Sequence, residues 1–173
     1  EEGNRRTTAM KSILADIRDQ KITGVSEKEF SKIRCKILKP TATKAEIRKF
    51  LASIHISGKK DWPARNKGET ISLMIDLDGE TYLSIADHLG RSKNEIEKYY
   101  LAYKMSAEYS KRYSGVYMRT YSHWHEFYRS KHLQKQAQSD PGFRDTIMEW
   151  VHDRKITEHK QMRKLAEIYN PTV

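Results

Sequence analysis

The chain has 173 residues, with 33 lysines and arginines against 23 acidic residues and a formal net charge of +10. This length suffices for one domain or two small ones with a real hydrophobic core. The single cysteine, Cys35, excludes an intrachain disulfide framework and a cysteine-based zinc site. No apolar run approaches the length of a membrane span and no signal peptide is visible, so we expect a cytoplasmic protein with no membrane partner. Its positive charge favours an anionic partner, most commonly nucleic acid.

The first twenty residues predict an amphipathic helix that opens with a glycine and two arginines, Gly3, Arg5 and Arg6. Free amides at a helix start attract phosphate, and arginine side chains add bidentate contacts to phosphate oxygens. Taken alone, a glycine followed by two arginines is more typical of a solvated helix start than of a phosphate site. The expected apolar face consists of Ala9, Met10, Ile13, Leu14 and Ile17.

Residues 33–38, with the sequence IRCKIL, alternate apolar and basic side chains and predict the one convincing strand. Cys35 would then point inward as a small apolar residue rather than act as a reactive thiol. After this strand, either Thr41 or Thr43 can cap a helix over residues 44–56. Its expected apolar side consists of Ile47, Phe50, Leu51 and Ile54.

A further helix is expected to start at Trp62 and Pro63, since proline is well tolerated in a first helical turn. Residues 44–67 carry seven basic side chains against two acidic ones, a net charge of +5. These cations are candidates for contacts to the phosphates that flank a DNA site.

Residues 81–103 predict two short helices joined by a tight turn, the pattern of a helix-turn-helix DNA-binding unit. Ala86 is small enough for the helices to cross closely, and Gly90 can take the positive φ that the turn needs. Ser92 and Glu95 form an S-x-x-E capping box that opens the second helix. The expected core positions are Ile85, Ala86, Leu89, Ile96 and Tyr99.

The second helix of this pair leaves polar side chains outside the core, where they would enter a major groove. Residues 80–112 have a net charge of only +1, and Glu97 would repel phosphate unless it accepts from a cytosine amino group. Most of the electrostatic attraction must therefore come from neighbouring segments. A helical hairpin that touches no nucleic acid is the alternative. The candidate DNA-binding residues are Arg91, Ser92, Lys93, Asn94, Glu97 and Lys98.

Aromatic residues concentrate after this motif, with eight of the ten tyrosines between positions 99 and 128. Such residues among cations can stack on unpaired bases, but tyrosines at helical spacing more often pack a core. His123 and His125 lie two apart, on different faces of a helix, so we expect no metal site there. We expect two further helices, at residues 142–152 and 158–169, the last with Met162, Leu165 and Ile168 inward.

Residues 2–9, EGNRRTTA, resemble the second conserved box of the ParB family, a glycine, a polar residue and two arginines opening a helix. The family carries its helix-turn-helix downstream, and the resemblance covers about residues 1–103. It implies that Gly3, Asn4, Arg5 and Arg6 bind the phosphates of a nucleotide triphosphate, CTP with Mg²⁺. The family's domain, which shares the sulfiredoxin fold, begins with strands before this box. We therefore expect a truncated domain in a longer protein.

The resemblance implies a mainly α fold, multi-helical with a helix-turn-helix, and a small β contribution from a partial ParB/sulfiredoxin-like N-terminal region. The expected domains are residues 1–40, the C-terminal part of that region; residues 41–115, the DNA-binding domain; and residues 116–173, a C-terminal helical region. The implied partner is double-stranded DNA of the nucleoid, in chromosome or plasmid partition or in transcription regulation.

The family's third box, with glutamate, asparagine, glutamine and arginine, falls near residues 55–59, where only the charge of Lys59 survives. No catalytic residues are predicted, and enzyme activity would need the missing N-terminal part. A nucleotide hydrolase or nuclease is the first alternative function. A helical interaction module that forms a homodimer through its tyrosine-rich helices is the second.

Overall fold

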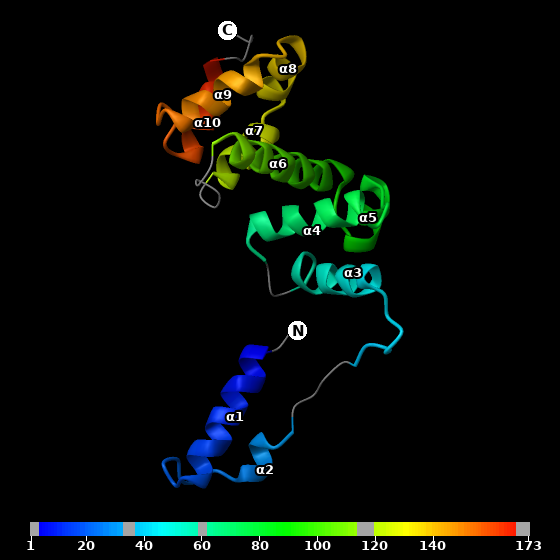
Figure 1. Ribbon diagram of the computed structural model, residues 1–173, viewed down its shortest axis with the longest axis vertical. Helices are drawn as coiled ribbons and strands as arrows, with labels where there is room; N and C mark the ends of the chain where they lie inside the picture. The colour runs from blue at the N-terminus through cyan, green and yellow to red at the C-terminus, as the bar shows by residue number, and fades with distance from the viewer. Residues whose placement is uncertain (1–3, 33–36, 59–61, 114–119, 169–173) are drawn as a thin grey trace. The chain divides into compact units, whose positions relative to one another are not determined.

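The computed structural model describes residues 4–32, 37–58, 62–113 and 120–168, and for residues 4–6 the backbone alone. All regular structure in these ranges is helical, which confirms the mainly α class (Figure 1). The small β contribution is not shown: residues 33–36 of the predicted strand lie outside the described residues, and Ile37 and Leu38 have irregular backbone. The helices are α1 (Asn4–Arg18), α2 (Glu27–Phe30), α3 (Lys44–His55), α4 (Ala64–Asp76), α5 (Tyr82–Leu89), α6 (Lys93–Arg112), α7 (Tyr121–Arg129), α8 (Lys131–Ser139), α9 (Phe143–His152) and α10 (His159–Ile168).

The chain divides into two compact units, residues 1–41 and 42–173. The first unit holds α1 and the short α2, which are joined by a hydrogen bond of 2.6 Å from Arg18 Nε to Glu27 Oε1. None of the described side chains of this unit is buried, so its two helices enclose no hydrophobic core. The division of the second unit at residue 115 stays a prediction.

A first hydrophobic core lies between α3, α4, α5 and the start of α6. The helix-turn-helix positions expected in the core are all buried there, which confirms the periodicity argument for residues 81–103. In α3 the side facing the core is different from the one expected. Ala52 and Ile56 are buried, whereas Ile47, Phe50, Leu51 and Ile54 are only partly covered.

A second hydrophobic core lies between the remaining turns of α6 and helices α7 to α10. Tyr109, Tyr121 and Tyr128 are buried in it beside Trp124 and Phe127. Core packing of the tyrosine-rich segment is therefore confirmed for these residues. In α10, Met162 faces this core as expected, but Ile168 is 76% exposed, so its predicted inward position is wrong.

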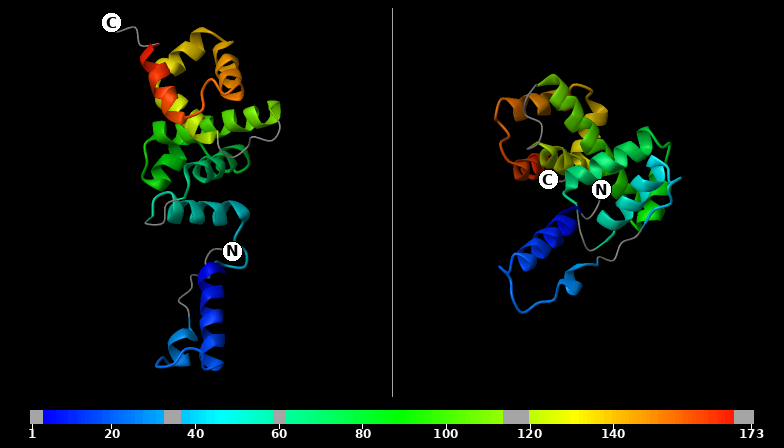
Figure 2. Two further views of the ribbon diagram at one scale, coloured as in Figure 1. Left: turned by 90° about the vertical axis from the view of Figure 1, so that its left-hand side faces the viewer. Right: turned by 60° about the horizontal axis from the view of Figure 1, so that its bottom comes forward.

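Helix α6 belongs to both cores, because its first turns pack Ile96 and Tyr99 into the first and its later turns pack Ala102 and Met105 into the second. In the second unit, α3 lies on one side of α6, and α8, α9 and α10 lie on its other side (Figures 1 and 2). The start of α6 is thus held in the first core and its later turns in the second.

Local capping fixes where the helices begin. Thr43 caps α3 in a full capping box with Glu46, which decides between the two candidate threonines. Pro63 is the N-cap residue of α4, one position before the first turn in which it was expected. Gly90 ends α5 with φ 61°, the left-handed conformation that glycine adopts at little cost.

Helices α4 and α6 lie close together at Gly68, which is buried. A Cβ atom at this position would lie 2.8 Å from Tyr121 Oη, 2.9 Å from the carbonyl oxygen of Tyr99 and 3.2 Å from Tyr103 Cβ. Two of these three neighbours are backbone or near-backbone atoms that cannot swing away. The absence of a side chain therefore sets the α4–α6 spacing.

An ion pair joins α7 to α10 at the edge of the second core. Arg163 donates from Nε and Nη2 to the two carboxylate oxygens of Glu126, each at 2.9 Å, and Arg129 Nη1 donates to the same carboxylate at 3.1 Å. Glu126 is 9% exposed, so its charge depends on these partners. The hydrogen bonds from Arg163 hold the pKa of Glu126 below its ordinary value.

Replacing Gly68 by alanine is expected to destabilise the protein. The methyl group gains up to about 1 kcal/mol of helix propensity, but overpacking against α6 costs about 1–3 kcal/mol. Denaturant unfolding should show a net loss. Asn66→Ala, at an exposed site of the same helix, is the control and should not lower stability. A Gly68→Ala variant at least as stable as the parent would contradict the close approach.

The Glu126–Arg163 pair is expected to make stability depend on acid pH. Because the folded pKa of Glu126 is lowered, its contribution is complete above the ordinary value of 4.5 and is lost as the pH falls through the lower folded value. Glu126→Gln should therefore lower the melting temperature at neutral pH, and the gap to the parent should shrink on acidification. Glu167→Gln, an exposed carboxylate of α10, is the control; an equal gap at every pH would contradict the assignment.

Candidate nucleic-acid interface

Helices α5 and α6 form a helix-turn-helix arrangement with a three-residue connection, Gly90 to Ser92. The turn is fixed by a hydrogen bond of 3.0 Å from the N–H of Arg91 to the carbonyl of Ala86. Ser92 Oγ accepts from the N–H of Glu95 at 3.2 Å, which is one half of the predicted capping box. The carboxylate of Glu95 lies 3.5 Å from Arg91 Nη1.

The start of α6 presents four of the predicted DNA-binding residues. Lys93 and Asn94 are exposed, whereas Glu97 and Lys98 are half-buried. Burial is the main cause of the raised pKa of Tyr82, at the start of α5, and the charge of Glu97 contributes to it. The carboxylate of Glu97 is therefore near α5, while Asn94 and Lys98 line a hollow shared with α7.

The other two predicted residues, Arg91 and Ser92, have structural contacts. Arg91 Nη2 donates to the carbonyl oxygen of Ile56 at 2.8 Å and so ties the turn to the end of α3. Ser57 Oγ donates across the same junction to the carbonyl oxygen of Leu89 at 2.5 Å. The hydroxyl of Ser92 is used as the helix cap. The most available side chains for a base contact are thus Lys93 and Asn94.

The basic segment before the motif is less available for phosphate than its charge suggests. Arg48 forms an ion pair of 3.1 Å with Asp78, and Lys49 forms one of 2.8 Å with Glu80. Lys67 is buried with its Nζ 5.7 Å from the ring centre of Tyr99. Contacts from Lys49 and Ser84 lower the pKa of Glu80. Arg48 and Lys49 thus link α3 to the connection between α4 and α5, and Lys67 links α4 to α6.

Helix α7 contributes two residues that sequence reasoning did not place at this interface, His125 and Arg129. Both line the hollow beside Asn94 and Lys98. Their spacing of four predicts that they share one face of a helix. The sequence does not indicate that this face meets the start of α6, because the contact joins segments about thirty residues apart.

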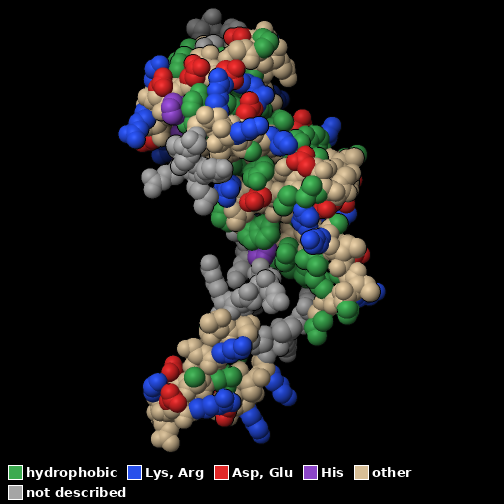
Figure 3. Space-filling model, viewed as in Figure 1, with side chains coloured by type: hydrophobic (Ala, Val, Ile, Leu, Met, Phe, Trp, Pro, Cys, Tyr) green, Lys and Arg blue, Asp and Glu red, His purple; other side chains and the backbone are tan. Residues whose placement is uncertain are grey.

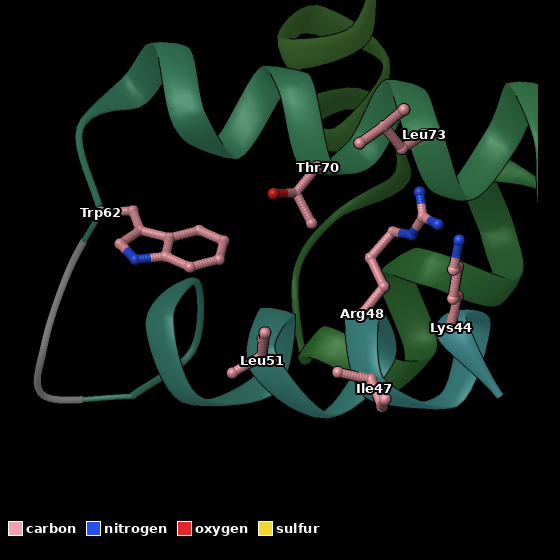
Figure 4. A pocket seen from close by; sticks show the side chains of 7 residues that line it. All are labelled: Lys44, Ile47, Arg48, Leu51, Trp62, Thr70 and Leu73. Atoms are coloured by element: carbon pink, nitrogen blue, oxygen red, sulfur yellow. The ribbon is translucent and has the colours of Figure 1, made fainter. Parts of the chain in front are cut away.

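A second hollow, of about 360 Å³, lies between α3 and α4 and has mainly apolar walls. Figure 4 shows Trp62 projecting into it from the connection before α4, and Arg48 extending from α3 toward α4. The buried His55 stacks on Trp62 with ring centres 4.4 Å apart. Leu73 contributes to the wall while 38% exposed.

Several predicted binding residues fall outside the described part of the chain. Gly3 is among them, as are the side chains of Asn4, Arg5 and Arg6, so the nucleotide-phosphate site stays a prediction. The backbone of α1 begins at Asn4. Lys59 also lies outside.

The histidines considered as metal ligands are His123 and His125. His123 is buried on the side of Thr157, whereas His125 stacks on Tyr99 at 5.1 Å between ring centres, so the two point apart. Among the described residues, no group of three histidine, cysteine or acidic side chains could hold a metal ion.

Basic and acidic side chains alternate over the face of residues 42–173 that Figure 3 shows, without a single large basic patch. None of the described helices combines the length and apolar character that a membrane span requires.

No protein-family model, no curated protein and no solved structure matches this chain.

Substituting Arg91 by alanine is expected to destabilise the turn, because the contact to the Ile56 carbonyl is lost. Since the side chain is 38% exposed, we expect a loss of about 1 kcal/mol in the free energy of unfolding. Denaturant unfolding without DNA measures it, with Lys93→Ala as a matched control that should unfold like the parent. If the Arg91→Ala variant unfolds like the parent, the contact to Ile56 does not stabilise the turn, and Arg91 is again a candidate for binding DNA.

Proposed function

We propose that this chain binds double-stranded DNA through the start of α6. The observation that carries the proposal is the helix-turn-helix arrangement of α5 and α6, whose second helix begins with the exposed Lys93 and Asn94. In such units the start of the second helix contacts base edges in the major groove. The net charge of +10 supports the same partner.

Base recognition is assigned to Asn94, because its amide can donate and accept in a bidentate contact to adenine. Lys93 offers a single ammonium group for guanine or for phosphate. Arg91 stabilises the turn and Ser92 caps the start of α6, so neither is assigned a base contact. The resemblance to the ParB family supports the proposal, because that family also carries a helix-turn-helix after its arginine box. For the full-length protein, the proposal includes nucleotide binding at that box.

Both substitutions at the start of α6 are expected to weaken DNA binding, in different ways. Asn94→Ala should relax sequence preference at one position, with a loss of about 1–3 kcal/mol on the preferred site. Lys93→Ala should weaken binding to every sequence or relax one guanine position. The measurement is a gel shift against a pool of random duplexes, with sequencing of the bound fraction.

Lys111→Ala is the matched control, because it removes an exposed lysine from the last turn of the same helix. It should leave the sequence preference unchanged. Parent-like affinity and preference in both Lys93→Ala and Asn94→Ala would contradict the placement of the reading helix. A parent protein that binds no duplex would contradict the function itself.

A further inference from the structure

The hollow between the start of α6 and α7 has a volume of about 250 Å³ and a lining that is partly polar and partly apolar. From α6 and its cap it is lined by Ser92, Asn94, Glu95, Lys98 and Tyr99, and from α7 by His125 and Arg129. It adjoins the residues proposed to read DNA, since Asn94 belongs to both. Whatever enters this hollow is therefore held beside the reading helix.

Positive charge exceeds negative charge around this hollow. Arg129 pairs with Glu126 at 3.1 Å, but both carboxylate oxygens of Glu126 also accept from Arg163. One carboxylate is thus shared by two guanidinium groups, which leaves about one positive charge uncompensated. Among the described residues, no acidic side chain forms an ion pair with Lys98. The carboxylate of Glu95 is directed to Arg91 at 3.5 Å.

The ring of His125 responds to the same excess of cations. Burial lowers its pKa, the charge of Glu126 raises it, and Arg129, Lys98 and Lys67 lower it further. The imidazole is stacked on Tyr99 and lies 6.0 Å from Tyr121 between ring centres, so its position is fixed by packing. The imidazole ring therefore forms a fixed side of the hollow, next to which an anion can bind.

Two cationic side chains that line the hollow, Arg129 and Lys98, can contact an anion there without breaking any contact of the hydrophobic cores. Arg129 is 55% exposed, and its loss would leave Glu126 with the bidentate contact to Arg163. Lys98 is half-buried, and its flexible stem carries three donors. The first turn of α6 adds the positive end of a 20-residue helix.

We propose that this hollow holds one backbone phosphate of duplex DNA, with Lys98 and Arg129 as its charge partners. The inference rests on the proposed DNA binding and adds α7 to the interface. Phosphate contacts carry no sequence information but fix how a protein lies on the duplex. The hollow would thereby set the register of Asn94 over the bases.

The test is the salt dependence of binding to mixed-sequence duplexes, measured by fluorescence anisotropy. Neutralising one phosphate contributes about 0.9 to the slope of log affinity against log salt. Lys98→Ala and Arg129→Ala should each lower that slope by up to this amount, because they share one phosphate, and should weaken binding equally on duplexes of different sequence. Lys98→Arg, which keeps the charge, should restore the slope.

Lys111→Ala is the control for loss of one positive charge from α6 outside the hollow, and its slope should stay near that of the parent. Circular dichroism checks folding. Lys98→Ala breaks no ion pair with any residue that the structure describes, so this variant carries the test if Arg129→Ala is unstable. Parent-like slopes in both variants, with DNA still bound, would overturn the phosphate site alone. A parent protein that binds no duplex would overturn the proposed function as well.

Discussion

The structure of residues 42–173 depends on α6 being buried in two hydrophobic cores at once. Its first turns supply Ile96 and Tyr99 to the core of α3 to α5, and its later turns supply Met105 and Tyr109 to the core of α7 to α10. Side-chain packing at interior density leaves such a helix little freedom to rotate or slide. The lack of a side chain at Gly68 then fixes its distance from α4.

This double burial fixes which side chains the start of α6 exposes. Lys93 and Asn94 remain exposed because the core positions of the helix point to the opposite side. Arg91 anchors the turn to α3, and α7 lies against the other side with His125 and Arg129. The proposed reading helix thus lies in a near-neutral segment, and Arg129 of α7 adds positive charge beside it, which is consistent with specificity and affinity coming from different parts of the surface.

The sequence predicted the local features well, because they depend on neighbours a few residues apart. Ile85, Ala86, Leu89 and Ile96 are buried at the positions that helical periodicity demands, and Gly90 has the positive φ expected of it. Long-range pairing was not predictable: the contacts of Arg91 with Ile56, of Lys49 with Glu80 and of Arg163 with Glu126 each join residues more than 30 positions apart. For this reason the sequence suggests phosphate contacts for residues 44–67, although part of their charge stabilises the fold, and it does not indicate that α7 lies beside the start of α6.

The central claim, that the start of α6 meets double-stranded DNA, is tested most directly by a titration of the isotopically labelled chain with duplex DNA, followed through its backbone amide signals. The account predicts that the largest shifts fall on residues 91–98, with a second group at His125 and Arg129, while the exposed faces of α9 and α10 stay unchanged. Shifts confined to other helices, or no shifts at duplex concentrations that saturate comparable DNA-binding domains, would contradict it.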